Sequence, residues 1–360
     1  MVILTSGSLA QRNQQSPVED PNSPNQSGPE KATGRVRWYS LVSLIVIAAC
    51  LAEFLTGSTA ILVAVANPLG FATLLGMYGG GALLIREVAL RWRKRWGAVL
   101  LLGGAYAVGE EGFAAKTMVD PIGTDVGNEL YNHWMGVNWV PLSALTLFHA
   151  AFSIAVPLVL VELLFPATKG RRLVGNVGLG ITAMLYGLTI YLLSFGNPYT
   201  IPLPVTIFLA AYAFAFIVIA YLVPRSFLRA KTDLPDRRER NFILLGIFFM
   251  GGFFLISGGL GSGGDFLAHL LPWPVTSALF IPLAGLTAWY LVRHAGRSEN
   301  DAVKIAFALG MIIVFVPIDI TLELGGDTGV LLFTSLIFGV LLWLRELRAH
   351  PQNSSSAVRI

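Results

Sequence analysis

The stretch G-A-V-L-L-L-G-G-A-Y-A-V-G-E-E-G-F-A-A-K, residues 97–116, places two adjacent carboxylates inside an otherwise apolar segment. Glu110 and Glu111 are framed by Gly109 and Gly112. About 20 apolar residues are enough to span the hydrocarbon core of a bilayer, so this segment is typical of a transmembrane helix. A charge at the centre of such a helix costs about 2.5–3.5 kcal/mol on insertion scales. The stretch therefore predicts a membrane protein with a polar site within its helices.

The composition of the whole chain points to the same class of protein. Of 360 residues, 54% are hydrophobic and only 13% are charged, and the mean hydropathy is +0.67. The net charge of +4 does not indicate a nucleic-acid partner, because the basic residues flank apolar segments, as orientation in a membrane requires. We expect a lipid bilayer around the chain and no nucleic acid. Cys50 is the single cysteine, so an intrachain disulfide is excluded.

The apolar segments predict an all-α fold, a polytopic bundle of about ten transmembrane helices. The expected spans are 39–57, 69–90, 97–115, 139–163, 175–195, 204–224, 241–261, 274–292, 303–320 and 328–344. Residues 58–68 are too short to cross and are interpreted as a re-entrant or interfacial segment.

The positions of the basic residues predict the orientation of these spans. Apart from Arg86 and Lys116, every Lys and Arg falls in the N-terminal tail, in alternate loops or at the C-terminus. Basic residues collect on the cytoplasmic side of membrane proteins. We therefore expect both termini in the cytoplasm and a multi-pass protein of the cell membrane.

The domain organisation follows from the same pattern. Residues 1–37 are rich in Ser, Pro, Asn and Gln and are expected to form a disordered cytoplasmic tail. Residues 38–165 form a four-span half that carries the polar site, and residues 166–346 form a six-span apolar half. A second cytoplasmic tail covers 347–360.

Four polar residues of the first four spans are expected to share one pocket, open to the outside. Glu53 lies near the outer end of the first span, Glu110 and Glu111 lie in the outer half of the third, and His149 lies in the fourth. Two carboxylates side by side do not readily ionise together, so the pair is expected to hold a proton near neutrality. With a histidine beside it, such a pair can relay protons, hold a cation or activate a water molecule. A purely structural role, capping or bridging helices, is the alternative.

A second polar set lies toward the cytoplasmic side. Arg86 and Glu87 occupy the second span and Glu162 the fourth. We interpret this set as an orienting ion pair, with Glu162 as a partner for Arg86 across the bundle. No cofactor motif is recognised, so no cofactor is expected, and the sequence leaves metal binding open.

Two resemblances bear on function. The runs Y-A-V-G-E-E-G-F-A-A-K, V-D-P, G-V-N-W-V and F-H-A-A-F-S-I-A-V-P-L-V-L-V-E-L-L-F-P resemble a group of uncharacterised prokaryotic multi-span membrane proteins, over roughly residues 39–165. A fainter resemblance is to the CAAX-protease and bacteriocin-processing family of intramembrane proteases. That family carries E-E-x-x-x-R on one helix and F-x-x-x-H on a later one, which would assign water activation to Glu110, Glu111 and His149. Here Ala115 stands in the place of the Arg and Leu145 in the place of the Phe.

Three functions therefore stay open. The leading hypothesis is a transporter or permease of a small molecule or ion, with Glu110 and Glu111 as proton or cation site and His149 assisting. The first alternative is an intramembrane hydrolase that uses Glu and His. The second alternative is a non-catalytic membrane scaffold.

Overall fold

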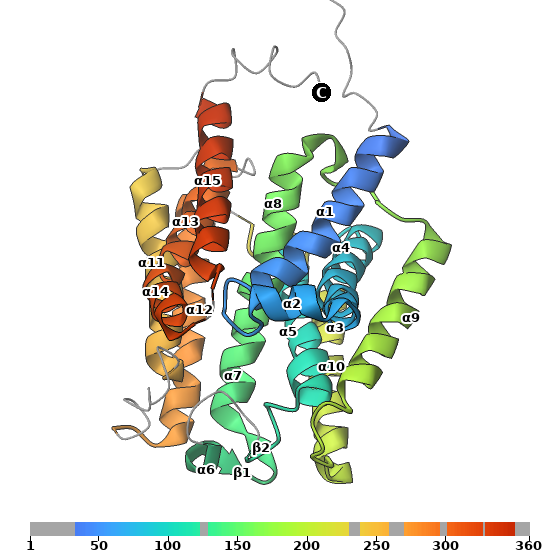
Figure 1. Ribbon diagram of the computed structural model, residues 1–360, viewed down its shortest axis with the longest axis vertical. Coiled ribbons are helices and arrows are strands. Elements are labelled where there is room, and N and C mark those ends of the chain that lie inside the picture. Colours follow the sequence, from blue (N-terminus) through green and yellow to red (C-terminus); the bar gives the residue numbers. More distant parts are fainter. Residues whose placement is uncertain are drawn as a thin grey trace, which may run out of the picture. The chain divides into compact units, whose positions relative to one another are not determined.

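The chain folds into long helices, most of which lie side by side with their axes roughly along the bundle (Figure 1). The structure, a computed structural model, describes residues 33–122, 129–229, 238–258, 270–295, 301–326 and 328–349. Within these ranges the only strands are β1 (His133–Trp134) and β2 (Val137–Asn138), which form a two-stranded antiparallel hairpin. The predicted all-α class is confirmed.

The first half of the chain contains several helices that change from α to π geometry along their length. Its helices are α1 (Gly34–Glu53), α2 (Ile61–Ala66), α3 (Pro68–Leu74), η1 (Leu75–Gly79), α4 (Gly80–Arg91), α5 (Trp96–Ala107), η2 (Val108–Ala114), α6 (Glu129–Asn132), α7 (Trp139–Phe148), η3 (His149–Ala155), α8 (Val156–Leu164) and η4 (Pro166–Thr168). Elements η1, η2 and η3 are π-helical, whereas η4 is a 3₁₀ turn.

In the second half, each helix among the described residues is an α-helix. They are α9 (Asn176–Leu193), α10 (Leu203–Leu222), α11 (Glu239–Ser257), α12 (Trp273–His294), α13 (Asp301–Ile313), α14 (Phe315–Gly325) and α15 (Val330–Ala349). Helices α9 and α10 pack against α4, α5 and η2 of the first half. The polar site is therefore enclosed by helices from both sides of residue 165.

Nine of the ten predicted spans coincide with helices, or with continuous helical stretches, that are long and apolar enough to cross a membrane, counted over the described residues. The predicted span 97–115 corresponds to α5 and η2, which together cover residues 96–114. This stretch carries Glu110 and Glu111 at its end, and these carboxylates reduce its apolar character. The chain is a multi-pass membrane protein.

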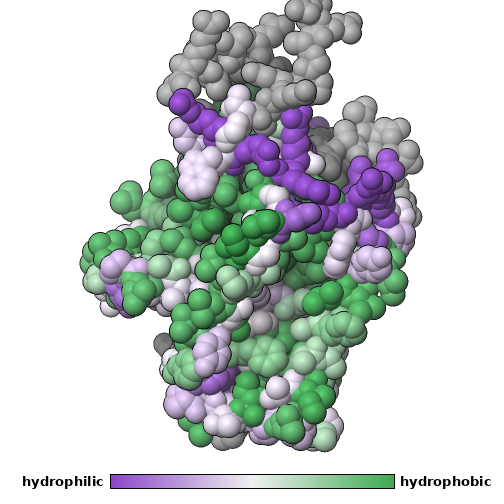
Figure 2. Space-filling view, turned by 90° about the vertical axis from the view of Figure 1, so that its right-hand side faces the viewer, coloured by the Kyte–Doolittle hydropathy of each residue, from purple (hydrophilic) through white to green (hydrophobic). Residues whose placement is uncertain are grey.

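The two ends of the bundle differ in polarity. Helix α1 begins and helix α15 ends at the same, upper end of the bundle (Figure 1). Hydrophilic residues gather toward this end, and hydrophobic residues dominate the face below them (Figure 2). The alternating basic loops predict this separation of polarity. Because α1 begins and α15 ends at the same end, the first and last spans run in opposite directions.

The segment predicted to be too short for a crossing forms helix α2. It runs across the long helices instead of along them (Figure 1). Leu62, Val63 and Val65 on it are largely exposed. A short helix with exposed apolar side chains, in a membrane protein, faces lipid or the interface.

Glycines allow the helices around the polar site to approach closely. A Cβ atom on Gly103 of α5 would lie 2.7 Å from the Cα atom of Ala150 in η3. Because the obstacle is backbone, no side-chain rotation could relieve such a contact. Small residues at helix interfaces commonly permit this kind of packing in membranes, and here it sets the spacing between the two helices that carry Glu110 and His149.

We expect Gly103→Ala to destabilise the protein by about 1–3 kcal/mol, the usual cost of overpacking. The matched control is Gly180→Ala on α9, where an added Cβ has no atom within 4 Å, so that substitution should leave the melting temperature unchanged or raise it. Thermal unfolding in detergent, followed by tryptophan fluorescence, measures both. Equal melting temperatures for the two variants would contradict the close approach.

We predict that both termini lie in the cytoplasm, because the basic loops belong to the same side as the two tails. A C-terminal fusion to green fluorescent protein should fluoresce, and a C-terminal fusion to alkaline phosphatase should be inactive. The reverse pattern would show that every span has the opposite orientation.

Candidate functional site

The candidate site lies where three π-helical turns meet. Tyr78 belongs to η1, Glu110 and Glu111 belong to η2, and His149 is the first residue of η3. A π turn is rare and occurs mostly as a single turn within an α-helix, frequently at functional sites. Three such turns around one cluster therefore mark this region among all the helices that the structure describes.

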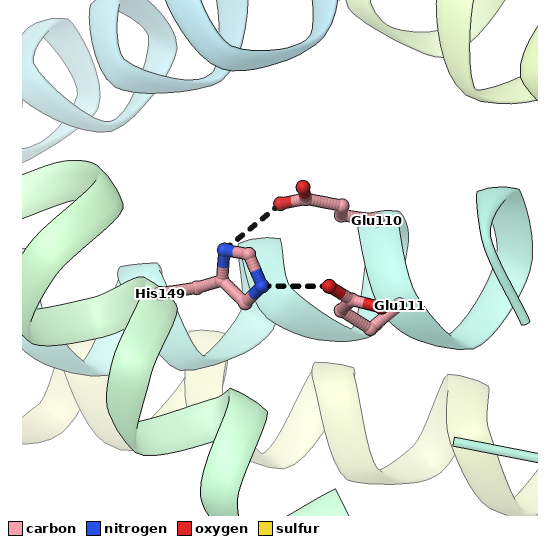
Figure 3. A group of neighbouring side chains, drawn as sticks. All are labelled: Glu110, Glu111 and His149. Atoms are coloured by element: carbon pink, nitrogen blue, oxygen red, sulfur yellow. Dashed lines mark hydrogen bonds and ion pairs between the residues drawn. The ribbon is translucent and has the colours of Figure 1, made fainter. Parts of the chain in front are cut away.

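His149 lies between the two carboxylates (Figure 3). Its Nδ1 atom is 3.1 Å from Glu110 Oε2, and its Nε2 atom is 2.9 Å from Glu111 Oε1. Neighbouring residues on a helix point in different directions. The imidazole ring accommodates both because its two nitrogens lie on different edges, so each carboxylate meets one nitrogen.

The cluster is almost completely enclosed by protein. Glu110 exposes 2% of its surface and His149 exposes 3%, whereas the side chain of Glu111 exposes 12%. Burying charged groups is costly unless they are paired and hydrogen-bonded. The charges of the three groups offset one another when the cluster holds an extra proton. This proton lies either on the imidazole, so that both ring nitrogens carry hydrogen, or on one carboxylate.

Hydroxyl groups extend the cluster at the histidine and at Glu111. Ser153 Oγ is 3.0 Å from His149 Nδ1, one helical turn away on η3. Thr117 donates a hydrogen bond through Oγ1 to Glu111 Oε2. Glu111 is more exposed than Glu110 and His149, and this hydrogen bond connects it to the loop that follows η2.

Tyr78 links Glu53 to the cluster. Its hydroxyl interacts with the carboxylates of both Glu53 and Glu110. Glu53, at the end of α1, also accepts a hydrogen bond of 2.5 Å from Thr59 Oγ1. The four residues that the sequence places in one pocket are therefore brought together, with Glu53 joined through Tyr78.

A second tyrosine closes the cluster on the side of α5. The Tyr106 ring centroid lies 6.0 Å from that of His149 and 6.3 Å from that of Tyr78. Its hydroxyl group lies near Glu110 but does not meet hydrogen-bond geometry with any described residue, whereas Glu110 Oε2 has His149 Nδ1 as its partner at 3.1 Å. The Tyr106 hydroxyl is therefore a buried polar group that can take one further hydrogen bond.

Tyr78 and Tyr106 were missed by the sequence analysis, which considered charged residues and histidine. A signal existed for Tyr106, which precedes Glu110 by four residues and so lies on the same face of a helix. Tyr78 lies on a different helix, so only the tertiary packing of η1 against α1 brings it to Glu53.

The second polar set forms a separate network. Arg86 Nη1 lies 3.0 Å from Glu87 Oε1, and Arg86 donates 2.9 Å to the carbonyl of Thr168. Glu87 also pairs with Arg91 at 2.5 Å and accepts 2.7 Å from the amide of Leu173. These bonds tie α4 to the segment between α8 and α9, as expected of an orienting network.

Glu162 has interactions with two basic residues. Arg86 makes its direct ion pair with adjacent Glu87, and the carboxylate of Glu162, across the bundle on α8, also interacts with it electrostatically. Glu162 Oε2 lies 3.9 Å from Lys304 Nζ. Glu162 thus connects α8 to α13.

The cluster also offers donors for a metal ion. One ligand atom from each of Glu110, Glu111 and His149 can be chosen so that all lie within 4.8 Å of one another. Two carboxylate oxygens and one imidazole nitrogen suit a divalent transition metal. In the observed arrangement, however, the carboxylates face different ring nitrogens, so metal coordination through one nitrogen requires one carboxylate to move.

Comparison with known proteins places the chain in a family without assigning an activity. No curated protein and no solved structure matches the chain. A family model described as an uncharacterized membrane protein family matches residues 42–344. This match covers most of the chain, well beyond residues 39–165, where the sequence resemblance lies. The chain therefore belongs to this uncharacterized membrane protein family.

Proposed function

We propose that the protein is a proton-coupled permease, in which Glu110, His149 and Glu111 bind and transfer the coupling proton. The observation that supports this proposal is the contact of both imidazole nitrogens with carboxylates, at 3.1 and 2.9 Å. A histidine in this position gains a proton from one neighbour and returns a proton to the other as the imidazole changes protonation state. Buried acidic and histidine residues form such relays in pumps and transporters.

The hydroxyl groups give the relay two extensions. On one side, Thr117 contacts Glu111, the least buried member of the cluster. On the other side, Tyr78 joins Glu110 to Glu53, which in turn contacts Thr59. A hydroxyl group can donate and accept a hydrogen bond at once. Protons can therefore pass along this chain by exchange between neighbours, in steps that need no large movement of the helices.

We expect Glu110→Gln and Glu111→Gln each to lose at least about tenfold of any proton-coupled uptake into proteoliposomes, because an amide side chain cannot accept and release a proton as a carboxylate does. Glu162→Gln is the matched control, because Glu162 lies in the separate contact with Lys304.

Unchanged proton-coupled uptake in both cluster variants would exclude the relay. A wild-type protein that supports no uptake beyond that of empty proteoliposomes would favour a scaffold.

An intramembrane hydrolase is the second candidate, and one observation favours it. Glu110 and Glu111 contact His149 from a different helix, which is the arrangement that the resemblance to CAAX proteases implies. A carboxylate beside an imidazole can activate water for attack on a peptide bond. Glu111 is the better placed of the two for water, since its side chain is more exposed.

For this candidate, Glu110→Ala and His149→Ala should each eliminate cleavage of a membrane-embedded peptide in detergent micelles. Ser143→Ala on α7, whose hydroxyl bonds only within its own helix, should leave cleavage intact. Cleavage that survives both cluster substitutions would exclude the hydrolase, and a wild-type protein that cuts no peptide would leave the permease as the function to test.

A further inference from the structure

A groove at the other end of η2 lies outside the proton relay. It is formed by the end of η2, the last turns of α9 and the segment that joins α9 to α10, and it encloses about 580 Å³. Sites for small molecules commonly enclose about 300–1,000 Å³. The groove is therefore large enough to hold part of an organic ligand.

Lys116 supplies the positive charge of this groove. Its ammonium group donates hydrogen bonds of 2.5 and 2.8 Å to the carbonyl oxygens of Asn197 and Tyr199. An ammonium group has three donors, so one remains. Lys116 exposes only 8% of its surface, and no carboxylate among the described residues lies within ion-pair distance of it. A buried cation whose contacts are neutral carbonyls is electrostatically uncompensated.

The backbone around Lys116 is held in an unusual conformation. Its φ angle is +65°, in the left-handed region that non-glycine residues seldom adopt. Asn197 fixes this turn by donating to the carbonyl of Ala115 at 3.1 Å and to Asp120 Oδ2 at 2.8 Å. Asp120 accepts a hydrogen bond from this amide and not from the ammonium group of Lys116.

The remaining walls of the groove are mainly apolar and aromatic. Phe113 lies on one side, and Tyr191, Phe195 and Ile201 lie on the other. Tyr191 and Phe195 stack edge to face, with ring centroids 5.0 Å apart, and both are largely exposed. One buried cation beside an open aromatic wall matches a ligand with an anionic head and an apolar body.

We propose that this groove binds an amphipathic organic anion, with its carboxylate or phosphate against Lys116 and its apolar part against Tyr191 and Phe195. A carboxylate or phosphate accepts the unused ammonium donor and neutralises the buried charge. The apolar part covers aromatic surface that is exposed without it. The anion comes either from a membrane lipid or from a free amphiphile.

The groove adjoins the candidate relay along the chain. Lys116 precedes Thr117, whose hydroxyl donates to Glu111, and Phe113 belongs to the same π turn as the two glutamates. A ligand that pulls on Lys116 therefore acts on the hydrogen bond at the exposed end of the cluster. The binding proposal itself does not depend on the permease, because binding is measured at equilibrium without transport.

Laurate, a twelve-carbon carboxylate, tests the site in calorimetry with the full chain in detergent. We expect saturable binding that Lys116→Gln weakens at least about tenfold, since a hydrogen bond to a charged group is roughly twice as strong as a neutral one. Lys94→Gln is the matched control. Lys94 lies on the loop between α4 and α5, outside the groove, and it also donates a hydrogen bond to a backbone carbonyl, that of Val223 at 2.6 Å. Dodecanol, which lacks the charge, should bind wild type and Lys116→Gln equally.

A second variant covers the case in which Lys116→Gln does not fold. Tyr191→Ala removes part of the aromatic wall and leaves the hydrogen bonds of Lys116 in place, and it should also weaken laurate binding. Native mass spectrometry from nanodiscs that contain phosphatidylglycerol separates the two sources of the anion. A phosphatidylglycerol molecule that wild type retains and Lys116→Gln loses identifies a lipid as the ligand. A wild type that retains no phosphatidylglycerol but binds laurate identifies a free anion. Laurate binding that is absent in wild type, or equal in wild type and both groove variants, would overturn the proposal.

Discussion

The contact of one imidazole with two carboxylates is the interaction on which the arrangement of the first half depends. Each of these groups alone would be costly within a membrane helix. Together they compensate one another, with His149 at 2.9 and 3.1 Å from its two neighbours. The helices that carry them must therefore stay close, and Gly103 permits this because it presents no side chain to Ala150. Electrostatics and packing thus impose the same distance between η2 and η3.

The two polar sets of the chain illustrate different uses of buried charge. Arg86, Glu87 and Arg91 bond mainly to one another and to backbone of the segment after α8, and among their buried side-chain atoms Arg91 Nε alone lacks a hydrogen-bond partner within the described residues. In the Glu110 cluster, the buried Tyr106 hydroxyl has no hydrogen-bond partner among the described residues, and Glu110 Oε2 has only the contact with His149 Nδ1. A fully satisfied network holds helices in place. An incompletely satisfied one keeps capacity for a further proton or ligand, which is why the proposed function is assigned to the Glu110 cluster.

Much of the fold and part of the site were predictable from the sequence. The length of the apolar segments located the spans, because a bilayer crossing needs a nearly fixed number of residues. The free-energy cost of charge within a membrane helix pointed to Glu110 and Glu111, since two carboxylates in an apolar segment need partners. The direct ion pair of Arg86 with Glu87 was not predicted, because helix position alone does not say which of two nearby carboxylates an arginine contacts. Tyr78 and the π turns were not predicted at all. An aromatic residue in an apolar run carries no separate signal, and a π turn departs from the period on which sequence patterns depend.

The π turns also have a consequence for how this chain tolerates changes in length. A π turn accommodates one more residue than the α turn it replaces. Removing a single residue from Val108–Ala114 would let η2 revert to α-helix, and the side chains of the former π turn would then point in other directions. Helix length and hydrophobicity would hardly change, and the chain would still insert into the membrane. The loss would fall on the alignment of Glu110 and Glu111 with His149, so the three turns make the site far less tolerant of deletions than the helices that carry it.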